Sequence, residues 1–199
     1  MNIHTPQVIF LVGLVSYIAI REVYQRRVAG SEGTVKRTSA SDRLLVVLVF
    51  FGQAIVPAFY LFTPWLNGAN YEMPRALAWL GAVISAAGLW VFWRSHADLG
   101  KNWSVTLELQ SDHRLVTHGV YRIVRHPMYS SFLLFGVGQA LLLPNGLAGP
   151  SALIAVTLLC IFRVPREEAM MCEHFGQEYR EYIQRTGSVV PWVGVSRGA

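Results

Sequence analysis

Apolar residues along this chain are gathered into five blocks, and polar, charged segments separate them. The blocks are too continuous for the apolar stripe of a soluble amphipathic helix, and several approach the roughly 20 residues that a helix needs to cross a bilayer. Flanking Trp, Tyr and Arg side chains at the headgroup level can complete the shorter ones. The pattern predicts an all-α integral membrane bundle of about five transmembrane helices, at residues 6–20, 44–62, 76–93, 128–143 and 147–162.

Two prolines predict local features of this bundle, a kink and a tight link between helices. Pro57 lies inside the second block, where it should kink the helix and free a carbonyl for a neighbouring helix. Residues 144–146, Pro-Asn-Gly, join the fourth and fifth blocks and predict a tight antiparallel hairpin. Because the two arms have comparable lengths, we expect Arg125, His126 and Arg163 to lie at a similar depth in the membrane.

The tail that follows Arg163 is polar, with apolar residues at helical spacings of three and four. This spacing predicts a cytoplasmic amphipathic helix that ends near Gly187 and Pro191. No composition shift indicates a second unit, so residues 1–199 are expected to form a single membrane domain. The apolar residues of the tail are Met171, Phe175, Tyr179, Tyr182 and Ile183.

Composition and charge narrow the class of protein. With 53% hydrophobic residues, 15% charged residues and a mean hydropathy of +0.36, the chain is too apolar for an ordinary soluble domain. Sixteen of the 17 Lys and Arg residues fall in segments 21–43, 94–125 and 163–199. By the positive-inside rule these segments and the C-terminus are cytoplasmic and the N-terminus is outside. The net charge of +5 therefore reflects topology and argues against a nucleic-acid partner. In a prokaryote this chain would lie in the plasma or inner membrane.

The sequence offers little support for a metal site, a disulfide framework or a cleaved signal. The two cysteines, Cys160 and Cys172, have no CxxC spacing, and the six histidines form no HxxH or HxxxH pair. No basic residue precedes Arg21, so the first block is expected to be a retained helix and not a cleaved signal peptide.

The densest group of ionisable and aromatic residues is HRLVTHGVYRIVRHPMY, residues 113–129, which runs directly into the fourth apolar block. Pro127 in the first helical turn leaves neighbouring N–H groups free, and free N–H groups at a helix start favour an anion. Tyr121 and Tyr129 can stack on a purine or hydrogen-bond a ribose. We therefore expect residues 99–129 to bind a polar, charged cofactor, with residues 163–193 closing over it.

Arg163 and Glu167 lie four residues apart at the membrane boundary, so one helix face carries both. A solvated ion pair would contribute little there. At membrane depth, however, an ionisable pair is costly and more often marks a substrate path.

These segments resemble the isoprenylcysteine carboxyl methyltransferase family, within a wider group of small membrane methyltransferases that includes phospholipid N-methyltransferases. The resemblance covers about the C-terminal half and implies S-adenosylmethionine bound on the cytoplasmic side, with Arg163 and Glu167 beside the methyl acceptor. One departure is Ser130-Ser131, where eukaryotic members often have a glycine. The matching segments are LGKNW (99–103), HRLVTHGVYRIVRHPMY (113–129), RVPREE (163–168) and FGQEYREY (175–182), and the implied cofactor positions are His113, Leu115, Val116, Tyr121, His126 and Tyr129.

The resemblance leaves the acceptor open. A carboxylate needs no general base, so Arg163 would hold it and Glu167 would fix that arginine. For an amine or thiol, Glu167 would instead accept a proton. We favour an apolar acceptor that enters from the bilayer, such as the carboxylate of an isoprenylcysteine-like compound. The alternatives are a phospholipid, amine or thiol methyltransferase, an NAD(P)H-dependent sterol-type reductase, and a non-catalytic scaffold whose basic loops bind anionic lipid.

Overall fold

The structure is a computed structural model that describes residues 4–28, 40–100 and 115–191. These residues form helices and contain no β-strand, which confirms the all-α class. Short 3-10 helices lie at Asn67–Ala69 and Gly119–Arg122. The longer helices are α1 (Thr5–Val28), α2 (Ala40–Phe50), a π-helix (Phe51–Ile55) continuous with α3 (Val56–Phe62), α4 (Arg75–Leu99), α5 (Pro127–Leu142), α6 (Ser151–Phe175) and α7 (Gln177–Arg185).

Within the described residues, three helical stretches are long and apolar enough to cross a membrane, namely Thr5–Arg27, Ala40–Phe62 and Arg75–Leu99. Helix α5 is apolar but has 16 residues, and α6 is apolar only in its first half. Large apolar side chains such as Val12 and Val83 are more than 60% exposed. In water such surfaces would be costly, so they are suited to lipid.

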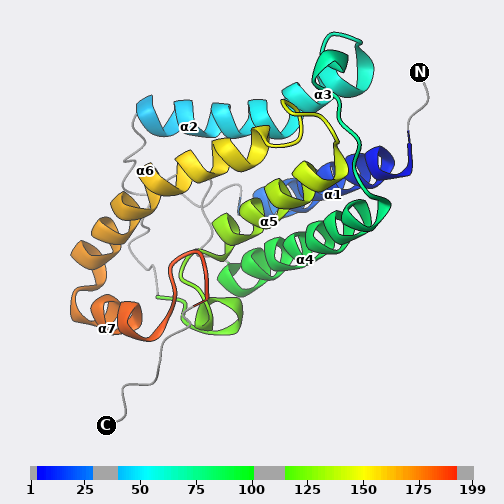
Figure 1. The fold of residues 1–199 in the computed structure, drawn as a ribbon. Coiled ribbons are helices and arrows are strands. Elements are labelled where there is room, and N and C mark those ends of the chain that lie inside the picture. The colour runs from blue at the N-terminus through cyan, green and yellow to red at the C-terminus, as the bar shows by residue number, and fades with distance from the viewer. Residues whose placement is uncertain (1–3, 29–39, 101–114, 192–199) are drawn as a thin grey trace.

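The helices form two groups that meet along α5 and α6 (Figure 1). Helices α1, α4 and α5 lie side by side, and α2 runs along α6. Tyr17 of α1 packs on Phe92 of α4 and Phe135 of α5, with ring centroids 4.6 and 4.7 Å away. Helices α4 and α5 approach closely at Gly81, where an added Cβ would lie 2.7 Å from the Leu141 Cβ.

The bend predicted at Pro57 is a π-helix in the preceding turn, Phe51–Ile55. In π-helical bonding, residue 57 would donate its N–H to the carbonyl of Gly52, and proline has no N–H to give. The freed Gly52 carbonyl accepts hydrogen bonds from Gln139 Nε2 at 3.0 Å and Ser151 Oγ at 2.6 Å. The kink thus joins the second apolar stretch to α5 and α6.

The predicted hairpin link at residues 144–146 is too short, and the predicted helix start at residue 147 is wrong. The link occupies residues 143–150, because the Asn145 side chain folds it into a compact turn. Asn145 Oδ1 accepts the N–H groups of Leu147 and Ala148 at 3.0 and 2.9 Å, and Nδ2 donates to the Leu66 carbonyl at 2.6 Å. Helix formation is delayed until Ser151.

The polar tail does not form one separate helix after the last apolar block. Helix α6 continues without a break through Arg163 to Phe175. Gly176, with φ of +57°, then turns the chain into α7. Arg163 and Glu167 therefore stand on the same rigid helix as the apolar block before them.

Candidate active site

The candidate site forms where the first turn of α5 meets the middle of α6. Arg163 Nε lies 2.8 Å from Glu167 Oε1 within α6, and the Tyr129 hydroxyl of α5 donates to the same oxygen at 2.5 Å. The side chains of Arg163 and Glu167 are only 13% and 16% exposed. The Glu167 carboxylate is thus shared between a cation of its own helix and a phenol of the neighbouring helix.

His126 lies between two consecutive carboxylates. Its Nδ1 is 3.4 Å from Glu167 Oε2, and its Nε2 is 3.2 Å from Glu168 Oε1. The ring also stacks on Tyr129, with centroids 5.7 Å apart. Burial alone would lower the pKa of His126, but the hydrogen bonds to the two glutamates outweigh it and leave that pKa raised. The geometry therefore favours an imidazolium that donates from both ring nitrogens.

Glu168 gathers donors from three parts of the chain. Its Oε1 lies 3.2 Å from His126 Nε2, 2.9 Å from Arg125 Nη2 and 3.2 Å from Ser188 Oγ. The hydrogen bond from His126 and the contacts with Arg125 outweigh burial and lower the pKa of Glu168 to about 2. Glu167 likewise has a lowered pKa, because contacts with His126, Arg163 and Tyr129 outweigh its burial. Both carboxylates are ionised at neutral pH.

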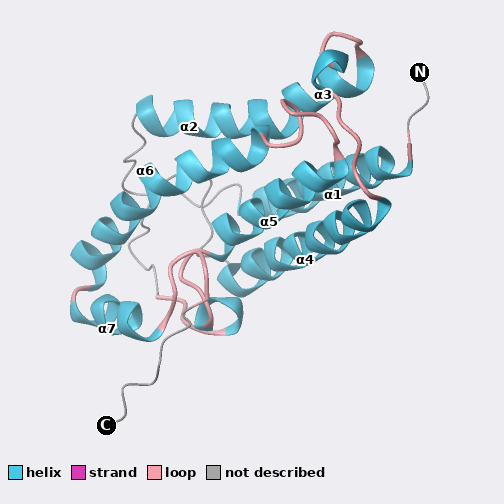
Figure 2. Cartoon of the chain, viewed as in Figure 1, coloured by secondary structure: helices cyan, strands magenta, loops and turns pink. Residues whose placement is uncertain are grey.

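Residues 186–189 run alongside residues 123–126, as the adjacent loops in Figure 2 show. The N–H groups of Arg125 and His126 donate to the carbonyls of Gly187 and Ser188 at 2.8 and 3.1 Å. The Arg125 guanidinium also binds the carbonyl of Thr186. The His126 N–H is therefore used within the protein and is not free for an anion, whereas the expectation for the N–H groups of Met128 and Tyr129 stays a prediction.

The structure brings together four of the predicted site residues: His126, Tyr129, Arg163 and Glu167. Tyr121 is buried instead, and its hydroxyl points to the Ser95 carbonyl of α4 at 3.4 Å. Leu115 and Val116 are half-buried. His113 lies outside the described residues.

Sequence reasoning missed Glu168 as a site residue. It used Arg125 only to compare the depth of residues in the membrane and did not place it in the site. A signal for Glu168 was present, since two adjacent glutamates on one helix diverge by about 100° and can flank a single side chain. The pairing of residues 123–126 with 186–189 has no local signal, because the two segments lie some 60 positions apart.

The side chains that contact one another at the site form a network with an excess of positive charge when His126 is protonated. Its members are Arg125, His126, Tyr129, Arg163, Glu167 and Glu168. With His126 protonated, the cations are Arg125, Arg163 and His126, and the anions are Glu167 and Glu168. The Glu167 contact uses Nε of Arg163, and within the described residues its two terminal nitrogens have no hydrogen-bond partner, so they can bind a second carboxylate. The arrangement fits one additional anionic group. The stacked rings of His126 and Tyr129 offer an aromatic surface beside it.

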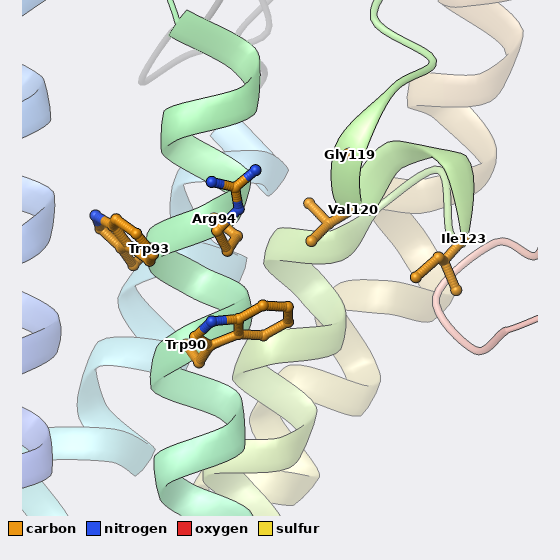
Figure 3. Close-up of a pocket in the computed structure, with 6 residues that line it drawn as sticks. All are labelled: Trp90, Trp93, Arg94, Gly119, Val120 and Ile123. Atoms are coloured by element: carbon orange, nitrogen blue, oxygen red, sulfur yellow. The ribbon is translucent and has the colours of Figure 1, made fainter.

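A separate hollow of about 440 Å³ lies between α4 and the turn at residues 119–123 (Figure 3). Its lining includes none of the network residues. Trp90 and Trp93 are 57% and 44% exposed, typical of tryptophans at a membrane surface. The lining residues are Trp90, Trp93, Arg94, Gly119, Val120 and Ile123.

Comparison with known proteins places these residues in a family context. Residues 79–173 match the model of the isoprenylcysteine carboxyl methyltransferase (ICMT) family. A probable protein-S-isoprenylcysteine O-methyltransferase of Oryza sativa subsp. indica is 37% identical over 89 residues, which are 45% of this chain and 47% of the relative. Protein-S-isoprenylcysteine O-methyltransferase B of Arabidopsis thaliana is 35% identical over 114 residues, 57% of this chain and 55% of the relative. The matches thus span about half the length of these relatives.

The fold has a counterpart among solved structures. The structure of a eukaryotic intramembrane Ras methyltransferase, isoprenylcysteine carboxyl methyltransferase, aligns with a TM-score of 0.61 and 26% sequence identity. The alignment covers 96% of this chain and 69% of that chain. Together with the exposed apolar helices, this likeness supports an integral membrane protein. The resemblance seen in the sequence is confirmed: residues 79–173, which carry most of α4, all of α5 and most of the candidate site, match the isoprenylcysteine carboxyl methyltransferase family.

Proposed function

We propose that this protein transfers the methyl group of S-adenosylmethionine to a carboxylate on an apolar acceptor of the isoprenylcysteine type. The observation that carries the proposal is the buried network of Arg163, Glu167, Tyr129 and His126, with its one excess positive charge. That network lies within the segment that matches the family. An anionic acceptor group supplies a negative charge with which Arg163 can pair.

Arg163 binds the acceptor carboxylate through its terminal nitrogens, and Glu167 holds the guanidinium in place. Tyr129 and His126 in turn fix Glu167, so the acceptor is oriented by groups on both α5 and α6. When bound, S-adenosylmethionine supplies an electrophilic methyl group on a sulfonium cation. An attacking carboxylate is already ionised, so none of these residues has to accept a proton.

Exclusion of water assists this reaction. An anionic acceptor and a cationic methyl donor give a neutral ester and a neutral thioether, so charge is lost on the way to the transition state. A site beside the membrane core therefore accelerates the step. It also admits an apolar acceptor laterally between helices, without passage of its lipid chain through water.

The cofactor site comprises His126 and Tyr129, whose rings lie beside the Glu167 carboxylate, together with His113, Leu115, Val116 and Tyr121. Aromatic faces and carboxylates suit a sulfonium cation. The topology has five spans, formed by the three long apolar stretches, α5 and the first half of α6. The basic segments and α7 face the cytoplasm, where S-adenosylmethionine is available.

The test uses purified protein in detergent. Calorimetry should detect binding of S-adenosylmethionine and of its demethylated product. With methyl-labelled cofactor, N-acetylated S-farnesylcysteine should acquire a label that mild base releases as methanol, and the matching carboxamide should acquire none. Label on an aminophospholipid that resists base would instead indicate an amine methyltransferase. Folded protein that binds no cofactor would contradict the proposal.

A further inference from the structure

Asp98 stands in the last turn of α4, and its carboxylate reaches across to the turn Gly119–Arg122. Its Oδ2 accepts the Val120 N–H at 2.9 Å, and its Oδ1 accepts Arg94 Nη2 at 2.5 Å. The side chain is only 8% exposed. Figure 3 shows Arg94 on α4 and, facing it, the turn that carries Gly119 and Val120. Asp98 thus joins two parts of the chain that are 22 positions apart.

The turn is shaped to receive this carboxylate. Gly119 has φ of +59°, a conformation that residues with a Cβ rarely adopt. A Cβ added at Gly119 would overlap with the Asp98 carboxylate. The Val120 N–H can approach Asp98 only because residue 119 is glycine. The same carboxylate pairs with Arg94, so one side chain joins the guanidinium of α4 to the backbone of the turn.

The turn is also held from its other sides. The Tyr121 hydroxyl lies 3.4 Å from the Ser95 carbonyl of α4, and the Tyr121 carbonyl accepts the Tyr182 hydroxyl of α7 at 2.5 Å. Along the chain the turn lies between Leu115 and His126, two of the cofactor positions. Its placement therefore sets the position of the residues on both sides of it.

We propose that Asp98 is a positioning residue, which fixes the Gly119–Arg122 turn in the conformation that lets the surrounding residues hold S-adenosylmethionine. This inference rests on the proposed function. Asp98 contacts neither Arg163 nor Glu167, so its effect should fall more on cofactor binding than on the acceptor.

The test measures the dissociation constant for S-adenosylmethionine and its KM and kcat with a carboxylate acceptor. Asp98→Ala should raise the dissociation constant and the KM about 10- to 100-fold, the loss expected when a hydrogen bond to a charged group is removed. The kcat at saturating cofactor should change less than about threefold. Asp98→Asn, whose amide oxygen can still accept the Val120 N–H, should show a smaller defect.

Glu22→Ala serves as the matched control, because Glu22 forms the same type of i, i+4 pair with Arg26 on the exposed face of α1. It should leave all three constants unchanged. Hydrogen exchange of the amides at 119–124 should accelerate in the Asp98 variants and not in the control.

If Asp98→Ala does not fold, the same three constants measured for Asp98→Asn test the proposal. Wild-type cofactor affinity in a folded Asp98 variant would overturn this proposal alone, as would equal losses in cofactor affinity and in kcat. A wild-type protein that binds no S-adenosylmethionine would overturn both this proposal and the proposed function.

Discussion

The Tyr129 hydroxyl donates a 2.5 Å hydrogen bond to Oε1 of Glu167. The same oxygen lies 2.8 Å from Arg163 Nε, so a group on α5 controls the orientation of the arginine on α6. The acceptor site is therefore assembled by the packing of two helices. A substitution at the start of α5 should alter the orientation of the Arg163 side chain.

Tyr129→Phe should lower kcat about 10- to 100-fold while the protein remains folded. The substitution keeps the ring and removes one donor from a buried, ionised carboxylate, a loss of about 1.5–3 kcal/mol. Steady-state kinetics with a carboxylate acceptor checks this. Tyr60→Phe is the control, since the Tyr60 hydroxyl bonds Gln7 at 3.3 Å away from the network. Equal rates in the wild type and Tyr129→Phe would show that the hydrogen bond has no part in turnover.

His126 should make stability depend on pH. Its folded-state pKa is raised above the ordinary value of about 6.5, because contacts with Glu167 and Glu168 outweigh burial. Its stabilising contribution is therefore fully present below pH ~6.5 and is lost as the pH rises through the folded pKa. Thermal unfolding between pH ~5.5 and ~9 should show a melting temperature that declines with pH by about 2–4 °C per kcal/mol lost.

His126→Gln should remove most of this decline, and His174→Gln at the exposed end of α6 should keep it. In the part of the chain that the structure describes, the titratable groups in contact with the His126 ring are Glu167, Glu168 and Tyr129. Glu168, with a pKa of about 2, adds a loss of stability only in strong acid, so it does not distort this range. An identical pH profile in the wild type and His126→Gln would contradict the assignment of the charged imidazole.

Arg125→Ala should loosen the attachment of residues 186–189 to residues 123–126. Arg125 binds Glu168 at 2.9 Å and the carbonyls of Ile183 and Thr186, so its removal leaves a partly buried carboxylate with fewer donors. We expect a destabilisation of about 3–5 kcal/mol, the range for breaking a buried pair. Hydrogen exchange should accelerate at residues 186–189.

Arg122→Ala, an exposed cation three residues earlier, is the matched control and should leave both measurements unchanged. If residues 186–189 exchange at the wild-type rate in Arg125→Ala, the guanidinium does not hold this segment.

Gly81→Ala should weaken the packing of α4 on α5. The added Cβ would lie 2.7 Å from the Leu141 Cβ, so one helix must shift, at a cost of about 1–3 kcal/mol. Thermal unfolding measures this loss. At Gly68 an added Cβ meets nothing within 4 Å, so Gly68→Ala should leave the melting temperature unchanged.

The helical class and the positions of the apolar helices could be predicted because membrane spans need long apolar stretches with few charges. The effect of Pro57 could also be predicted, since proline cannot donate to the helix ladder. The start of α6 could not, because it depends on Asn145 bonding to Leu66 across the bundle. The continuity of α6 past Arg163 could not be predicted either, because the change in polarity at that point is also typical of a helix end.

Within the site, the pairing of Arg163 with Glu167 followed from helical spacing. The meeting of Tyr129 and His126 with α6 required the hairpin geometry, which the sequence indicated through the short link. The pairing of residues 186–189 with residues 123–126 depends on backbone hydrogen bonds. The sequence predicts that residues 163–193 close over residues 99–129, but backbone hydrogen bonds carry no side-chain signature, so the paired residues could not be located.

The central claim is that Arg163 holds the acceptor carboxylate. Single-turnover transfer of labelled methyl groups to N-acetylated S-farnesylcysteine, compared between the wild type and Arg163→Lys, tests this most directly. Lysine keeps the charge but not the planar fork, so we predict a loss of at least about 100-fold in transfer, with the S-adenosylmethionine dissociation constant within about threefold of wild type. Transfer by Arg163→Lys at the wild-type rate would contradict the account.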